Sequence, residues 1–455
     1  FKQKTAYEML RSLVGSEMCI RDRLYGSLLM QRPSFFYGYY IISACAGIQA
    51  ITIGTYVAFG VFFKPLLAEF TWSRAMLSGA HSLAFLISGS LGILVGRLTD
   101  RFGPRLLMTA AGFFFGFSLL LLSTIHTPWQ LFLFYSLFFG MALSTADVIP
   151  LNTTARWFVR RRGVMTGVVK MGTGFGQMLI PFMANILIVG LGWRMAYAVI
   201  GCCGMVLLVL IAQVLRHDPF RMGFLPDNSR AETLESGLGG GEISLWNVMK
   251  GRAFWIIFFA NLSACFCLMS VMAHIVPHAI DTGISPISAA AILSTIGGAS
   301  IVGRFFIGSA IDRIGSRHAM ILCFVLLLLM LLWLQVSKKL WMFYLFAVVY
   351  GFTHGGLFTA ISPIVAEYFG IRSHGLLFGV AAFAGTVGGF LGPIFAGSIF
   401  DLTGSYGIAF WGYVMVAAIG LTLIFSLKPV DSVKESSEKN WRHRDVGGRS
   451  GKPKG

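Results

Sequence analysis

The sequence has little charge and few acidic residues. Only 12% of its 455 residues are Asp, Glu, Lys or Arg, whereas soluble domains carry about 25%. The 19 acidic residues are outnumbered by 36 basic ones, which gives a net charge of +17. The mean hydropathy is +0.75. A water-soluble protein of this length could not bury so much apolar surface, so this composition predicts a membrane protein.

Other features are also missing. Six of the seven cysteines lie inside apolar runs, where Cys behaves as a small hydrophobe, so a disulfide framework is excluded. The alternation of polar and apolar residues that marks a membrane β-strand is absent. The chain also lacks an intramembrane H-E-x-x-H or G-x-S-x-G motif. We therefore expect no enzyme, no metal and no cofactor.

Apolar runs of about 20 residues, the length that spans a bilayer as a helix, dominate the chain. We expect twelve membrane-spanning helices, at about residues 38–62, 75–96, 106–124, 130–153, 163–186, 195–215, 253–276, 288–308, 319–336, 341–364, 374–397 and 407–427.

A ten-residue pattern, G-x-x-x-D-R-x-G-x-R, occurs at residues 96–105 and again 212 positions later, at residues 308–317. The same offset separates Pro65 from Pro277 and Gly163 from Gly375. We therefore expect an all-α polytopic membrane protein made of two pseudo-symmetric six-helix bundles. The expected parts are a non-native or disordered segment (1–29), the first bundle (30–215), a cytoplasmic linker (216–252), the second bundle (253–428) and a disordered basic tail (429–455).

Basic residues indicate the orientation. The short loops on the side of the repeated pattern carry ten Lys and Arg, and those on the opposite side carry five. Because cytoplasmic loops are enriched in Lys and Arg, the repeated pattern and both termini are predicted to be cytoplasmic. The net charge therefore does not indicate a nucleic-acid partner.

The doubled D-R-x-G-x-R pattern resembles the signature of the major facilitator superfamily. The stretch 157–163, followed by Gly167 and Met171-Gly172, resembles the signature of its monocarboxylate-transporter and oxalate/formate-antiporter branch. The stretches 62–65, 218–226 and 392–406 fit the same branch. The resemblance covers about residues 35–427 and implies the major facilitator fold, with two bundles that rock about a site in the middle of the membrane.

The resemblance also implies that the repeated pattern latches the bundles together on the cytoplasmic side. Its glycines permit close helix approach and tight turns, and its Asp residues can cap a helix N-terminus. The alternative is a loop whose arginines only fix orientation. The expected gate residues are Gly96, Asp100, Arg101, Gly103, Arg105, Gly308, Asp312, Arg313, Gly315 and Arg317.

Arg304 is one of four ionisable residues inside the predicted helices, where a charge is costly and marks a pathway. It shares a small, polar helix face with Ser300, and an Arg can bind a carboxylate through two parallel hydrogen bonds. In the resembling monocarboxylate transporters, an Arg at this spacing binds the substrate carboxylate. Those proteins have an Asp where this chain has Ser300. The alternative is an Arg that reaches to the membrane interface.

Asp147 and Lys170 lie twelve residues before and eleven residues after the centre of a helical hairpin near residue 159. We expect them to form an ion pair, because pairing relieves the cost of burying each charge. The pair is either structural or opens during transport, and Lys170 could also help Arg304 hold a second carboxylate.

His354, the fourth residue, shares a helix face with Tyr350. The resemblance places a pocket-lining aromatic residue at position 354, and a His there can bind a carboxylate or carry a proton. The alternative is a His whose hydrogen bonds are satisfied between helices.

The leading functional hypothesis is a carrier of a small, monocarboxylate-like organic anion, working by alternating access with proton symport or anion exchange. We expect the protein to lie in the lipid of the cell membrane and to carry a small carboxylate, with or without a proton. We expect its transport unit to be a monomer. A second hypothesis is an exporter of drugs or other amphiphiles in the same fold, which needs an unpaired acid in the pocket. The third is an intramembrane enzyme or sensor.

Overall fold

The computed structural model describes residues 36–70, 72, 74–222, 224–228, 248–371 and 373–428. The predicted N-terminal segment 1–29, the tail 429–455, residues 229–247 of the linker and Arg372 lie outside the described residues.

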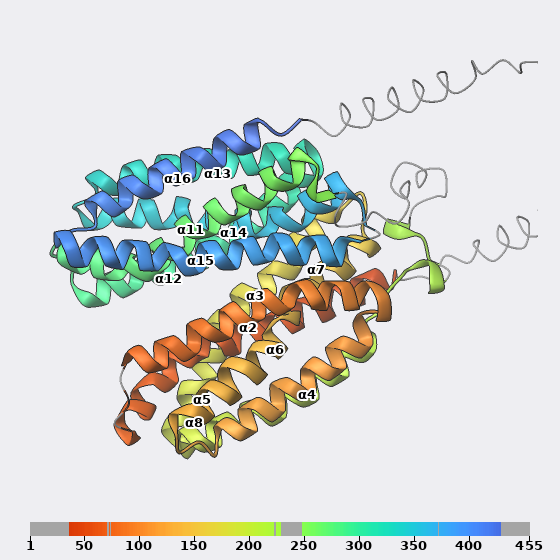
Figure 1. Ribbon diagram of the computed structural model, residues 1–455, viewed down its shortest axis with the longest axis horizontal. Coiled ribbons are helices and arrows are strands. Elements are labelled where there is room, and N and C mark those ends of the chain that lie inside the picture. Colours follow the sequence, from red (N-terminus) through yellow and green to blue (C-terminus); the bar gives the residue numbers. More distant parts are fainter. Residues whose placement is uncertain are drawn as a thin grey trace, which may run out of the picture.

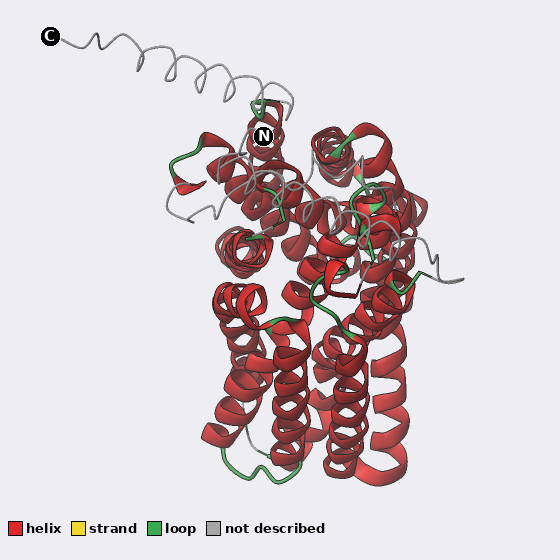
Figure 2. Ribbon diagram, turned by 90° about the vertical axis from the view of Figure 1, so that its right-hand side faces the viewer, coloured by secondary structure: helices red, strands yellow, loops and turns green. Residues whose placement is uncertain are grey.

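Almost all of the described chain is helical (Figure 2). The first half contains α2 (Gly38–Glu69), α3 (Arg74–Phe102), α4 (Pro104–Leu122), α5 (Pro128–Leu131), the π-helix η1 (Phe132–Phe139), α6 (Gly140–Leu143), α7 (Thr145–Trp157) and α8 (Arg162–Val214). Two short 3-10 helices follow, η2 (Phe220–Met222) and η3 (Pro226–Asn228). The second half contains α11 (Arg252–Asp281), α12 (Pro286–Ile314), α13 (Ser316–Val336), α14 (Leu340–Phe369), α15 (His374–Thr403) and α16 (Gly407–Phe425).

The predicted twelve spans agree with this arrangement. Within the described residues, 11 helical stretches are long and apolar enough to cross a membrane. One of them, α8, has 53 residues and is interrupted at Gly192, whose φ of 78° and ψ of 160° are not helical. Glycine adopts such a backbone without the steric cost that a Cβ atom brings. The turn at Gly192 divides α8 into two spans, which brings the number to twelve.

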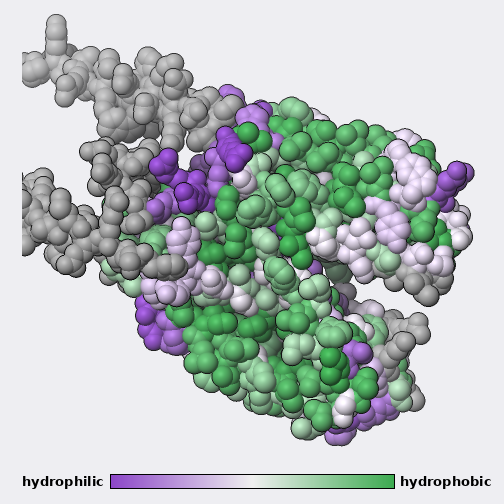
Figure 3. All heavy atoms as spheres, turned by 180° about the vertical axis from the view of Figure 1, so that it is seen from behind, coloured by the Kyte–Doolittle hydropathy of each residue, from purple (hydrophilic) through white to green (hydrophobic). Residues whose placement is uncertain are grey.

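The helices form two groups that lie one above the other in Figure 1, with α2–α8 below and α11–α16 above. The groups meet chiefly where α3 packs on α15 and where α8 packs on α12. Large apolar side chains cover much of the outer surface (Figure 3), and Val189, Leu402 and Phe182 are among the most exposed. This surface fits contact with lipid chains.

Glycines make close contacts between the two groups. A Cβ atom on Gly96 would overlap the carbonyl group of Gly375, and one on Gly308 would overlap that of Gly163. Each clash is reciprocal. The two pairs are related by the 212-residue offset with the halves exchanged, so the internal symmetry of the sequence is also a symmetry of packing.

The predicted helices 75–96 and 288–308 end too early. Helix α3 continues to Phe102 and α12 to Ile314, because a helix satisfies its own backbone hydrogen bonds beyond the point where its side chains become polar. The chain leaves the helical conformation at Gly103 and Gly315, with φ of 86° and 82°. We call the end of the molecule at which these two glycines lie the repeat end.

Replacing Gly308 with Ala is expected to destabilise the protein, because the new methyl group meets backbone atoms of α8 that cannot turn away. Overpacking of this kind costs about 1–3 kcal/mol. The measurement is the unfolding temperature of the purified protein in detergent. Gly397→Ala is the matched control, since a Cβ there meets nothing within 4 Å. Equal unfolding temperatures for the two variants would contradict the close contact.

Candidate functional site

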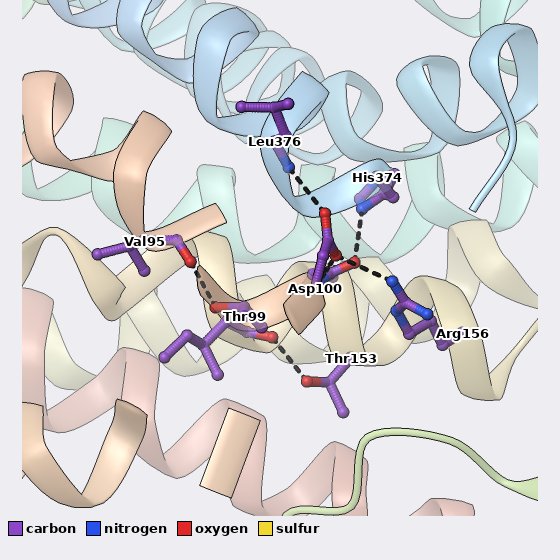
Figure 4. Close-up of polar contacts among 9 residues, drawn as sticks. Val95, Thr99, Asp100, Thr153, Arg156, His374 and Leu376 are labelled. Atoms are coloured by element: carbon purple, nitrogen blue, oxygen red, sulfur yellow. Dashed lines mark hydrogen bonds and ion pairs between the residues drawn. The ribbon is translucent and has the colours of Figure 1, made fainter. Parts of the chain in front are cut away.

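Asp100, in the last turn of α3, contacts both halves of the molecule (Figure 4). Its Oδ2 accepts a hydrogen bond of 3.2 Å from the backbone amide of Leu376, in the first turn of α15. Its Oδ1 accepts hydrogen bonds of 2.9 Å from Asn152 and from Arg156, both on α7. The amides at a helix N-terminus lack partners within the helix and favour a negative charge. Asp100 thus caps a helix of the opposite half, while Arg156 balances its charge.

Asp312, in the last turn of α12, makes the equivalent contact from the second half. Its two carboxylate oxygens accept hydrogen bonds from the backbone amides of Gly163 and Val164, at 2.5 and 2.9 Å. Both amides belong to the first turn of α8. The two Asp residues of the repeated pattern therefore each cap a helix across the boundary between the halves.

The arginines of the repeated pattern lie elsewhere. Arg105 donates two hydrogen bonds to Gln213, and Arg317 donates one to the carbonyl oxygen of Phe425, in each case within the same half. Arg101 is exposed, with its guanidinium 5.2 Å from the Phe102 ring centroid, and Arg313 is also exposed. Among the described contacts, the first glycine and the Asp of each copy of the pattern join the halves, and its arginines do not.

The two residues that we predict to pair, Asp147 and Lys170, lie in contact as an ion pair. The Lys170 Nζ donates a hydrogen bond to Asp147 Oδ1. The Lys170 side chain is 6% exposed, whereas the Asp147 side chain is 37% exposed. The hairpin turns between Trp157 and Arg162, as expected, and this places the two charges at the same depth.

Gln49 completes this network, and we did not predict it from the sequence. Its Nε2 donates hydrogen bonds to Asp147 Oδ1, at 2.7 Å, and to the carbonyl oxygen of Ala146, at 2.9 Å. Its Oε1 accepts one from the Thr173 hydroxyl. The signal that could have revealed it is a Gln in the middle of an apolar run, because a buried amide needs partners.

Arg304 lies on α12 and is 2% exposed. Its Nε and Nη1 are buried and have no hydrogen-bond partner. A Cβ added to Gly174 of α8 would lie 2.7 Å from Nη1, so the guanidinium lies at the boundary between the halves. Its charge also interacts with that of Asp147. The sequence predicted a buried Arg on a small, polar face, and that is where Arg304 lies.

His354, on α14, lies beside these charges and interacts electrostatically with Arg304 and Lys170. It is 7% exposed, and both ring nitrogens are buried without a partner. Its ring centroid is 5.0 Å from that of Phe358 and 6.2 Å from that of Tyr350. The alternative of a His with satisfied hydrogen bonds does not describe this residue.

The remaining two predicted substrate-binding residues have hydrogen-bond partners. The Ser300 hydroxyl donates to the carbonyl oxygen of Gly297 at 2.7 Å, within its own helix. The Tyr350 hydroxyl donates to the carbonyl oxygen of Leu268, on α11, at 2.7 Å. Of the five predicted side chains, Arg304, His354 and Lys170 therefore come together with Asp147, while Ser300 lies one turn from Arg304 and Tyr350 bonds to a neighbouring helix.

Comparison with known proteins identifies the family. The family model of the Major Facilitator Superfamily matches residues 45–308 and again residues 276–451. The chain is 24% identical over 396 residues to the MFS-type transporter YcxA of Bacillus subtilis strain 168, covering 84% of this chain and 92% of that protein. It is 24% identical over 428 residues to monocarboxylate transporter 13 of Bos taurus, covering 89% and 95%.

The fold is also similar to that of solved transporters of this superfamily. The structure of the proton:xylose symporter XylE aligns with a TM-score of 0.65 at 14% identity, covering 86% of this chain and 96% of that one. Together with the two matches to the family model and the two groups of membrane-spanning helices, this shows that the chain belongs to the major facilitator superfamily and is a membrane transporter.

Proposed function

We propose that the protein carries small organic anions of the monocarboxylate type, and that Arg304 binds the substrate carboxylate. The observation that carries this proposal is the buried guanidinium of Arg304, whose Nε and Nη1 have no partner. An unpaired buried charge is costly, and a carboxylate that accepts two parallel hydrogen bonds from a guanidinium would remove most of that cost.

The balance of charge in the site supports an anion. Lys170 and Asp147 neutralise each other through their ion pair. Arg304 then leaves the group with one net positive charge, and His354 adds two ring nitrogens that have no partner. The similarity to monocarboxylate transporter 13 of Bos taurus points the same way. A cation exporter, in contrast, needs an unpaired acid, and Asp147 is paired.

The arrangement of the halves supports alternating access. At the repeat end, Asp100 and Asp312 bond the halves together. At the opposite end, the space-filling view shows a hollow between them (Figure 3). We propose that this is the outward-open state, that the repeat end is the cytoplasmic gate of a monomeric transport unit in the cell membrane, and that transport proceeds by proton symport or anion exchange.

Replacing Arg304 with Ala is expected to abolish saturable carboxylate uptake into proteoliposomes. Loss of one partner from a buried charge contact costs about 3 kcal/mol, which corresponds to about a hundred-fold loss of uptake. The assay uses radiolabelled lactate, pyruvate, formate and oxalate, each with and without a pH gradient. Comparing uptake with and without the pH gradient distinguishes proton symport from anion exchange.

Arg252→Ala is the matched control for this experiment, because Arg252 is an exposed residue at the start of α11. Equal reconstitution of the two variants excludes a folding defect. Uptake by the Arg304 variant at the rate of the control would remove Arg304 from the binding site.

A third prediction concerns the ion pair between Asp147 and Lys170. Asp147→Asn leaves Lys170 buried and unpaired, so we expect a loss of stability of about 3 kcal/mol and a lower unfolding temperature. Exchanging the two residues, Asp147→Lys with Lys170→Asp, restores opposite charges and is expected to restore the unfolding temperature. We expect uptake to stay lost, because the pair opens and re-forms during transport. Recovery of uptake in the exchanged variant would show that the pair has only a structural role, which would contradict this expectation.

A further inference from the structure

His374 is the first residue of α15 and lies in the contact between the halves at the repeat end. It is completely buried. Its Nδ1 lies 3.3 Å from Oδ1 of Asn152, on α7 of the opposite half. Its Nε2 lies 3.2 Å from the carbonyl oxygen and 3.4 Å from the hydroxyl oxygen of Ser362, on α14. Figure 4 shows the ring beside the network of Asp100.

The orientation of the Asn152 amide fixes the proton on one side of the imidazole. Asn152 donates from Nδ2 to a carboxylate oxygen of Asp100, and an ionised carboxylate can only accept. The Oδ1 of Asn152 must therefore face His374, and this oxygen can also only accept. Nδ1 of His374 consequently carries a hydrogen.

The other side of the ring can accommodate either protonation state. In the neutral imidazole, Nε2 is an acceptor and takes the hydrogen of the Ser362 hydroxyl. In the imidazolium, Nε2 is a donor and the Ser362 carbonyl oxygen accepts its hydrogen. Ser362 thus offers a donor to the neutral ring and an acceptor to the protonated ring, both at the same nitrogen.

The charges around the ring favour the neutral state while the repeat end is closed. Burial of the ring opposes a positive charge on it, and so do Arg162, on α8, and Arg156, on α7. Among the described residues, the acidic group in its hydrogen-bond network is Asp100, which lies beyond Asn152 and is already bonded to Arg156. The neighbour of His374 on α14 is the uncharged Ser362. On its own helix, the ring centroid of Phe378 lies 5.8 Å from that of His374. The helix N-terminus at which it lies further opposes a positive charge.

We propose that His374 is a proton-binding site of the repeat end, neutral while the halves are joined there and protonated when they separate. Separation admits water to the imidazole and takes it away from Arg156 and Arg162, which belong to the other half. Because the open form binds the proton more tightly than the closed form, acid on this side of the membrane favours opening. The counterpart of His374 in the first half is Arg162, 212 positions earlier, so this proton site belongs to one of the two symmetric contacts.

The test measures hydrogen–deuterium exchange of the full-length protein in lipid nanodiscs, where one pH applies to both sides. The reporter is the protection factor of the Leu376 amide, which Asp100 holds in the closed form, corrected for the pH dependence of intrinsic exchange. An imidazole in contact with water has a pKa of about 6.5, so lowering the pH from about 7.5 to about 5.5 should reduce this protection about ten-fold. No substrate is required, so the result is independent of the role of Arg304.

His374→Gln is expected to reduce the pH response to less than about two-fold, because Gln does not titrate in this range. The control is His318→Gln, which removes an exposed histidine of α13 and should keep the ten-fold response. Ser362→Ala removes the donor that the neutral ring needs and leaves the carbonyl acceptor. The closed form of that variant then binds the proton more tightly, and the response should fall below about three-fold.

A full response in His374→Gln, or a wild-type protein whose protection does not change with pH, would overturn the proposal. If His374→Gln does not fold, the Ser362→Ala variant decides, since an unchanged ten-fold response there would also contradict it.

Discussion

The two halves are held together by carboxylates that accept hydrogen bonds from the N-terminal amides of helices in the opposite half. Asp100 reaches α15 and Asp312 reaches α8. Such contacts require the helix backbones to approach closely, and Gly96, Gly308 and their partners provide that approach. Both contacts lie at the repeat end, so neither of them holds the halves together at the opposite end. In the proposed transport cycle, these contacts would have to break before Arg304 could be reached from the repeat end.

The fold was predictable from the sequence because membrane-spanning helices leave a strong signal. Apolar runs of fixed length and a repeated offset give the number of spans and the division into halves. The ends of the helices were not predictable from the same signal. Helices α3 and α12 extend several residues beyond their apolar runs, since hydropathy reports where lipid ends and not where backbone hydrogen bonding ends.

The candidate site was predictable only in its charges. Ionisable residues are rare inside membrane-spanning helices, so Asp147, Lys170, Arg304 and His354 stand out in the sequence. The geometry of the helical hairpin then predicts that the first two pair. Gln49 was missed because an amide has no charge, so the sequence does not indicate an oppositely charged partner for it. The placing of the repeat arginines outside the contact was missed for another reason. Sequence spacing fixes which face of a helix a residue occupies, but not which neighbour that face meets.

The glycine contacts have a consequence for how the chain can vary. At each crossing, a side chain on one residue would meet the carbonyl oxygen of the other, and every amino acid has that carbonyl. No replacement of the partner can therefore make room for a side chain at Gly96, Gly163, Gly308 or Gly375. In an alignment of relatives that keep this contact, the four positions would be constant without covarying. Methods that find contacts from correlated substitution would consequently overlook these close approaches between the halves.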